Sequence, residues 1–162
     1  MTQKNLVTIL GVGNILFADE GFGVHFVRWF SDRYILPEEV RAIDGGTLGY
    51  ALLDIICSCE HLVVIDVIKL NDAPGSMYRF TRDEIESYLP PPTSAHEVKF
   101  LDVLCKAELM DDLPHVVFLC IVPGHYGDMD LEMTDVVKNK FEDMEKQLLK
   151  ELAIHNVAPE KI

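Results

Sequence analysis

Apolar and polar positions fall along this chain in blocks that predict a layered α/β fold. Short, uninterrupted apolar runs rich in Val, Ile and Leu are typical of buried parallel strands. Between them, apolar residues recur every three or four positions, which predicts helices with one buried face. The expected strands cover residues 5–13, 39–44, 61–68 and 115–122, with an edge strand at 76–80.

The expected helices lie between these strands. Phe22, Phe26, Phe30 and Tyr34 are spaced by four and predict a helix over 21–34. Further helices are expected at 48–58, at 82–88, from a Ser94-x-x-Glu97 capping box to about 110, and over 131–153. Alternating strands and helices in a chain of 162 residues predict one α/β domain, residues 1–162, with a mainly parallel sheet.

Composition narrows the function classes. The net charge of −13 disfavours nucleic acid and anionic membranes as partners. No apolar stretch is long enough to span a bilayer, and the N-terminal apolar run is interrupted by Thr8, Gly11 and Gly13, so we expect a strand rather than a signal peptide and a cytoplasmic protein. The four cysteines form no C-x-x-C pair and are expected to be buried free thiols.

Candidate chemistry gathers where the expected strands end. Ligands of parallel α/β sheets bind beyond the carboxyl ends of the strands. The residues that follow or end these strands, or that a neighbouring loop brings to the same edge, are Asn14, Asp19, Glu20, Asp44, Gly45, Gly46, Asp66, His96 and His125. The sequence therefore predicts a rim rich in acids and histidines.

The glycine turn after the first strand is a poor phosphate site. A dinucleotide fingerprint needs a third glycine where Leu16 stands, and there is no P-loop lysine. Asp19 and Glu20 place negative charge where a phosphate would lie. These acids either complement a helix N-terminus or bind a ligand, and the position of Glu20 favours a functional role.

The other rim residues each have two interpretations. Asp66 caps a turn or binds a cation, because an unpaired carboxylate in an apolar run is costly. Asp44 makes a turn and Thr47 caps the next helix, or Gly45 and Gly46 leave the backbone open to another chain.

A metal site follows from two carboxylates and one imidazole. His96 is either a loop residue without a function or a metal ligand. The partial positive charge of the helix N-terminus beside it disfavours protonation and would keep the ring neutral, as a ligand must be. Glu20, Asp66 and His96 would bind nickel or zinc through three ligands and leave the other coordination positions of the metal open. His125 is the alternative histidine ligand. The remaining histidines, His25, His61, His115 and His155, are weaker candidates.

Several blocks, in order, resemble one family. They are "LGVGNILFADEGFGVHFV", "DGGTLGYALL", "LVVIDVI", "APGSM" and "SAHEVKFLDVL", and they are similar to the maturation endopeptidases of nickel–iron hydrogenases. The segment "PGHYGDMDLEM" follows the family pattern only loosely.

The resemblance implies a three-layer α/β/α sandwich around a twisted, mostly parallel five-stranded sheet. It also implies removal of a C-terminal extension from the hydrogenase large-subunit precursor after nickel insertion, with the precursor's nickel as the recognition element. The family's metal-contacting positions correspond to Glu20, Asp66 and His96, and its second functional loop corresponds to residues 44–47.

The expected mechanism uses nickel brought by the precursor. The cation polarises the scissile carbonyl or activates a water, or it only licenses cleavage, while Asp44 positions the water or the peptide. No Gly-x-Ser-x-Gly elbow occurs, and no cysteine is expected on the rim. A non-enzymatic nickel-binding chaperone and a small-molecule hydrolase of the same fold are the alternatives. The sequence leaves the oligomeric state open.

Overall fold

A central five-stranded sheet organises the protein. The computed structural model describes residues 3–88 and 95–162, and the side chains of the second range from residue 100 onward. The strand order is β3-β1-β4-β6-β5. The strands are β1 (Asn5–Val12), β3 (Val40–Gly46), β4 (Cys59–Val67), β5 (Met77–Thr81) and β6 (His115–Ile121). All neighbours pair in parallel except β5, which runs antiparallel to β6 at one edge.

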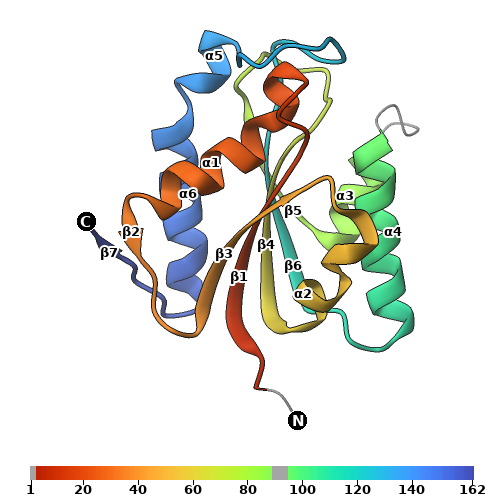
Figure 1. Ribbon diagram of the computed structural model, residues 1–162, viewed down its shortest axis with the longest axis vertical. Coiled ribbons are helices and arrows are strands. Elements are labelled where there is room, and N and C mark those ends of the chain that lie inside the picture. The colour runs from red at the N-terminus through yellow and green to blue at the C-terminus, as the bar shows by residue number, and fades with distance from the viewer. Residues whose placement is uncertain (1–2, 89–94) are drawn as a thin grey trace.

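Helices cover both faces of this sheet (Figure 1). One layer contains α1 (Phe22–Ser31), α5 (Asp135–Lys138) and α6 (Phe141–Ile154), and the other contains α2 (Leu53–Cys57), α3 (Arg82–Tyr88) and α4 (Ala95–Leu109). Two short 3₁₀ helices, η1 (Ala18–Gly21) and η2 (Gly49–Leu52), precede α1 and α2. The expected three-layer α/β/α sandwich with a mostly parallel five-stranded sheet is confirmed.

The alternating sheet positions divide the apolar side chains into two cores. Ile9 and Ile65 pack with Phe22, Phe26 and other residues of α1 and α6 on one face. On the opposite face, a second buried cluster fills the space between the sheet and α2, α3 and α4: Leu10, Leu62, Val64, Leu52, Ile56, Ile85, Phe100, Val103, Leu104 and Phe118. Burial on both faces explains why the strands have continuous apolar sequences.

Two helix predictions were wrong in extent. The helix expected over 21–34 ends at Ser31, and Tyr34 belongs to β2 (Tyr34–Ile35), which pairs with β7 (Glu160–Lys161). Tyr34 still stacks on Phe30, with ring centroids 4.6 Å apart, so the four-residue spacing does reflect a shared apolar contact.

The helix expected over 131–153 is two helices. Residues 131–134 are not helical, and α5 and α6 are separated at Asn139 and Lys140. Val137 on α5 and Met144 on α6 belong to the same core. The apolar period therefore continues across a break in the backbone.

The four cysteines are thiols, as predicted, but not all of them are buried. Cys59 and Cys120 are buried, Cys57 is intermediate and Cys105 is exposed on α4. The apolar stretch around Cys57 and Cys59, expected to be helical, is divided between two elements: Cys57 is the last residue of α2, and Cys59 is the first residue of β4. In the described part of the chain, no helix is both long and apolar enough to cross a membrane.

Candidate functional site

The carboxyl ends of the parallel strands share one edge of the sheet, near the top of Figure 1. The turn after β1 leads into η1, which packs against β4. Glu20 on η1 and Asp66 near the end of β4 are therefore brought to the same edge from positions 46 residues apart in sequence. This is the arrangement that the parallel topology requires.

The glycines of the first turn are explained by close packing inside the protein. Gly13 has φ +141°, and a Cβ there would lie 2.0 Å from the carbonyl oxygen of Glu20. A Cβ on Gly23 would lie 2.1 Å from the carbonyl oxygen of Ile65 and 2.5 Å from that of Val12. These glycines let α1 and η1 approach the strand ends, so no phosphate is needed to explain them.

Asp19 holds two loops together. Its side chain is fully buried, and its Oδ2 accepts hydrogen bonds from the N–H groups of Gly124 (2.7 Å) and His125 (2.9 Å) and from the hydroxyl of Thr134 (2.8 Å). Its Oδ1 accepts the Thr134 N–H at 2.8 Å. Four donors from residues more than a hundred positions away stabilise the buried charge. Asp19 therefore fixes the 123–134 loop against the first turn.

Glu20 is the neighbouring buried acid. Only 6% of Glu20 is exposed, and its Oε2 accepts a hydrogen bond from the Gly127 N–H at 3.3 Å. Its own backbone N–H donates to the carbonyl of Phe17, which closes the first turn of η1. The carboxylate thus lies between the first turn and the 123–134 loop, at the sheet edge.

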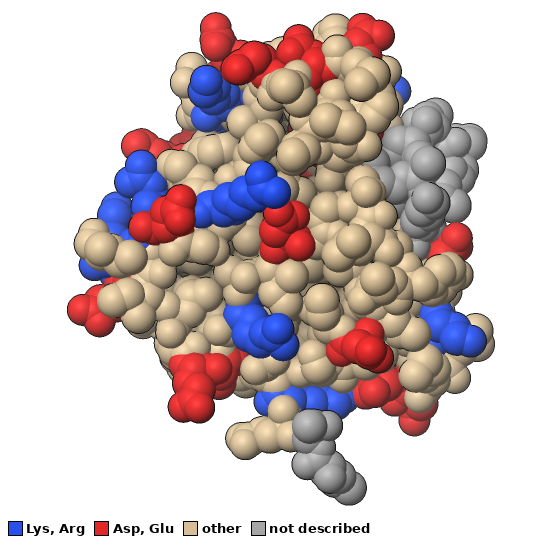
Figure 2. All heavy atoms as spheres, viewed as in Figure 1, with Lys and Arg blue, Asp and Glu red and all other residues tan. Residues whose placement is uncertain are grey.

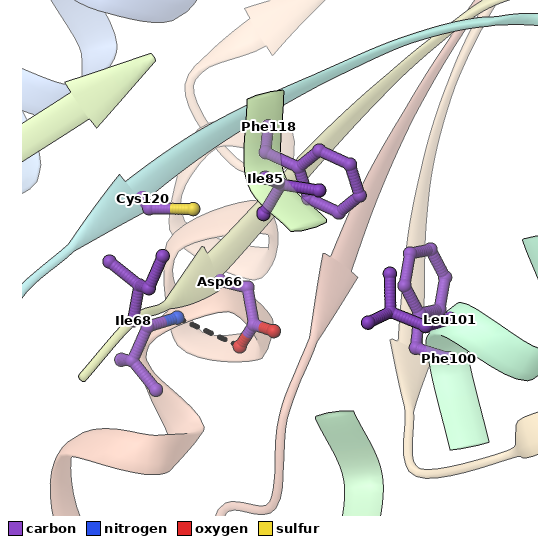
Figure 3. Close-up of a pocket in the computed structure, with 8 residues that line it drawn as sticks. Asp66, Ile68, Ile85, Phe100, Leu101, Phe118 and Cys120 are labelled. Atoms are coloured by element: carbon purple, nitrogen blue, oxygen red, sulfur yellow. Dashed lines mark hydrogen bonds between the residues drawn. The ribbon is translucent and has the colours of Figure 1, made fainter. Parts of the chain in front are cut away.

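Asp66 lies in an apolar recess (Figure 3). Asp66 is 8% exposed, and its Oδ1 accepts a hydrogen bond from the N–H of Val67 at 2.8 Å. Ile68, Ile85 and Phe118 are among the residues that line the recess with it. A carboxylate in such surroundings attracts cations strongly, because there is little water to screen its charge.

Cys120 corrects the expectation that no cysteine falls at this edge. It is paired in register with Asp66 across β4 and β6 and lines the same recess. Its side chain is buried. The position of Cys120 beside Asp66 depends on the register between β4 and β6, which the sequence alone does not give.

Asp44 lies farther along the edge, on β3, and is ion-paired. Its Oδ2 lies 2.6 Å from Nη2 of Arg28 and accepts a hydrogen bond from Nε of the same residue at 2.9 Å. This partly exposed pair connects β3 to α1. Gly45 packs inward, since a Cβ there would lie 2.7 Å from Cδ1 of Leu10. Gly46 has φ +48°, and a Cβ there would lie 3.8 Å from Oδ1 of Asp44.

The structure describes the side chain of His125 but not that of His96. His96 is the second residue of α4, but its side chain, like Ser94 and the predicted capping box, lies outside the described residues. His125 is 45% exposed, and its Nε2 lies 3.1 Å from Oδ2 of Asp128. Among the described side chains, to which that of His96 does not belong, no three His, Cys, Asp or Glu residues form a metal-binding group.

His25, a weak candidate from the sequence, lies beside the first turn. Its Nε2 is buried and makes no hydrogen bond in the described structure, and a Cβ on Gly21 would lie 3.3 Å from that nitrogen. Burial is the main cause that lowers the pKa of His25 below its usual value, with the charge of Arg28 adding to it. The ring is therefore neutral at pH 7. The sequence signal for it is only its position four residues after Gly21.

One family model matches most of the chain. The model described as HycI, hydrogenase maturation protease, matches residues 24–151. The matched range includes Asp44, Asp66 and His96 and begins after Glu20.

Individual relatives agree with this match. The chain is 34% identical over 141 residues to the hydrogenase expression/formation protein HupD of Bradyrhizobium diazoefficiens, covering 86% of this chain and 73% of that protein. It is 32% identical over 144 residues to the hydrogenase 2 maturation protease of Escherichia coli, covering 88% of each. The solved structure of the E. coli hydrogenase maturating endopeptidase HybD superimposes with a TM-score of 0.90 at 30% identity, covering 96% of this chain and 97% of the other.

Proposed function

This chain belongs to the hydrogenase maturation protease family, and from that premise we propose that it removes the C-terminal extension of the nickel-loaded large-subunit precursor of a nickel–iron hydrogenase. We propose further that Glu20, Asp66 and His96 recognise the precursor's nickel. In this account the nickel is part of the substrate and arrives with it.

The single observation that best supports the nickel site is the burial of two carboxylates at one edge of the sheet. Glu20 and Asp66 are each more than nine-tenths buried, and they come from elements in contact. Each has a backbone N–H as a hydrogen-bond donor. A second buried negative charge at the same edge raises the electrostatic free energy, and a divalent cation would offset that cost. Oxygen and nitrogen donors are a ligand set that suits nickel.

Each residue has a role in the proposed reaction. Glu20, Asp66 and His96 complete the coordination of the nickel, which fixes the adjacent peptide bond at the strand ends. A cation held there supplies Lewis-acid polarisation of the carbonyl or a bound water of lowered pKa. Asp44, oriented by Arg28, positions the water or holds the peptide.

The experiment that tests this function is the intact mass of the precursor. The wild-type protein is expected to shorten nickel-loaded precursor by the mass of the extension. Glu20→Gln, Asp66→Asn and His96→Ala are expected to slow the cleavage by about 100-fold or more, since even outer-shell partners of metal sites account for roughly 10–100-fold.

His115→Ala is the matched control, because it removes an exposed imidazole from the start of β6, at the opposite edge of the sheet. It is expected to leave cleavage unchanged. Transfer of nickel with the precursor polypeptide kept at full length would instead indicate a metal chaperone. Normal cleavage by His96→Ala would remove His96 from the site.

A further inference from the structure

Exposed apolar side chains gather next to the candidate site. Leu16 is 45% exposed, Met129 75% and Leu131 69%. We call these three side chains the rim patch. Isolated exposed apolar residues are normal on soluble proteins, but a group of them marks an interaction site.

The backbone holds the rim patch together. The Asp130 N–H donates to the carbonyl of Leu16 at 2.9 Å, and the Ala18 N–H donates to the carbonyl of Asp130 at 2.6 Å. Phe17 and Asp130 consequently form a parallel bridge. Leu16 therefore lies on the segment that pairs directly with the segment carrying Met129 and Leu131. The four hydrogen bonds of buried Asp19 anchor the same two segments.

The conformation of this loop is thus specified by buried polar contacts, although its apolar side chains face solvent. An unconstrained loop would be free to fold large side chains such as Met129 and Leu131 back onto the protein. Holding them outward costs hydrophobic free energy, which a bound partner would recover. The rim patch is therefore suited to docking.

Negative charge surrounds the rim patch. Residues 124–137 contain four acids and neither Lys nor Arg. All four acids are exposed: Asp128, Asp130, Glu132 and Asp135. Figure 2 shows acidic side chains gathered at the top of the view, where Figure 1 places α5 and its neighbouring loops. A partner that covers the patch must therefore present apolar side chains among basic ones.

We propose that the rim patch is the docking surface for the hydrogenase large-subunit precursor, and that it contacts an apolar segment of the precursor flanked by Lys or Arg. This inference rests on the proposed function, because it names the partner of the same sheet edge. Glu20 contacts the N–H of Gly127 in the same loop, so a precursor bound to the patch lies within reach of the candidate site. In this proposal the rim patch contributes to the affinity for the precursor, and the acids at the strand ends bind its nickel.

The test compares cleavage kinetics of two double variants on nickel-loaded precursor. Met129→Ser with Leu131→Ser is expected to raise KM by about tenfold or more and to change kcat by less than about twofold, because two exposed apolar contacts contribute to binding and not to the reacting atoms. Leu109→Ser with Met110→Ser is the matched control. These residues are 85% and 52% exposed at the C-terminal end of α4, away from the rim, and the control is expected to keep the wild-type KM.

Salt provides an independent measurement. The KM of the wild type is expected to rise with ionic strength, and Glu132→Lys is expected to raise KM at low salt. Equal thermal melting of all variants excludes unfolding as the cause.

The outcomes separate this inference from the proposed function. A wild-type protein that cleaves, together with a Met129→Ser/Leu131→Ser variant of unchanged KM, would overturn the docking surface and leave the protease function standing. A wild-type protein that leaves the precursor at full length would overturn the protease function itself. Sedimentation would also overturn the inference if the wild type dimerises and the double variant does not, because the patch would then bind a second copy of this chain.

Discussion

Replacing Asp19 by Asn measures how strongly one buried carboxylate holds the rim together. Three donors reach Oδ2 and one reaches Oδ1. If the amide oxygen of Asn takes the place of Oδ2, the N–H of Thr134 faces the amide nitrogen, which is also a donor. That loss costs about 1.5–3 kcal/mol, and the three remaining bonds lose their ionic character at about 0.5–1 kcal/mol each.

The neutral amide is easier to bury than a carboxylate, which offsets part of this cost. We expect a net destabilisation of about 2–4 kcal/mol, and so a Tm lower by about 4–16 °C in a chain of this size. Thr134→Val removes only the hydroxyl donor to Oδ2 and is expected to cost about 1 kcal/mol. The graded effect distinguishes loss of the cluster from loss of one bond.

The assay for Asp19→Asn is thermal melting followed by limited proteolysis. Cleavage within residues 123–134 is expected to accelerate, because that loop loses its anchor. A Tm within about 1 °C of the wild type, with no new cleavage in the loop, would refute the view that Asp19 organises the rim.

Three further predictions follow from other contacts. Gly23→Ala places a methyl group 2.1 Å from the carbonyl of Ile65, so α1 must move outward; we expect a loss of about 1–3 kcal/mol in urea unfolding and slower precursor cleavage. The pKa of His61 is lowered by burial and by two neighbouring histidines, so the unfolded chain binds the proton more tightly than the folded protein does. The contribution of His61 to the free energy of unfolding is therefore fully present above pH 6.5 and is lost as the pH falls below it. His61→Gln is expected to weaken this pH dependence of stability, measured by urea unfolding at several pH values. Burial and a hydrogen bond to Glu145 raise the pKa of Tyr34 to about 12; Tyr34→Phe is expected to cost about 1–3 kcal/mol and to remove only the last step of the ultraviolet tyrosine titration.

The sequence predicts the sheet well because local pattern and tertiary environment agree there. Buried parallel strands are apolar on both faces, so β1, β4 and β6 are visible as continuous runs. The parallel topology then places Glu20 and Asp66 at one edge without knowledge of any contact. Whether the side chain of His96 joins them stays a prediction.

The errors occur where residues distant in sequence decide the structure. Tyr34 leaves the expected helix because it pairs with Lys161 near the end of the chain. Residues 131–134 are not helical because Thr134 is hydrogen-bonded to Asp19. A helical period in the sequence cannot detect such partners, because the apolar positions of α5 and α6 continue in phase across the break.

The same limit applies to Asp19 as a functional candidate. From the sequence, Asp19 and Glu20 are equivalent acids at a helix start. The structure separates them, because Asp19 accepts four hydrogen bonds that connect residues 124, 125 and 134 to the first turn, whereas Glu20 accepts the N–H of Gly127 at 3.3 Å. Only the positions of residues 124–134 reveal that difference.

The most direct test of the central claim compares nickel-loaded and nickel-free precursor in parallel reactions with the wild-type protein. Intact mass spectrometry follows the loss of the C-terminal extension in each. The account predicts that only nickel-loaded precursor is shortened, because Glu20, Asp66 and His96 bind the cation that the precursor brings. Equal shortening of both precursors would contradict nickel recognition by this site.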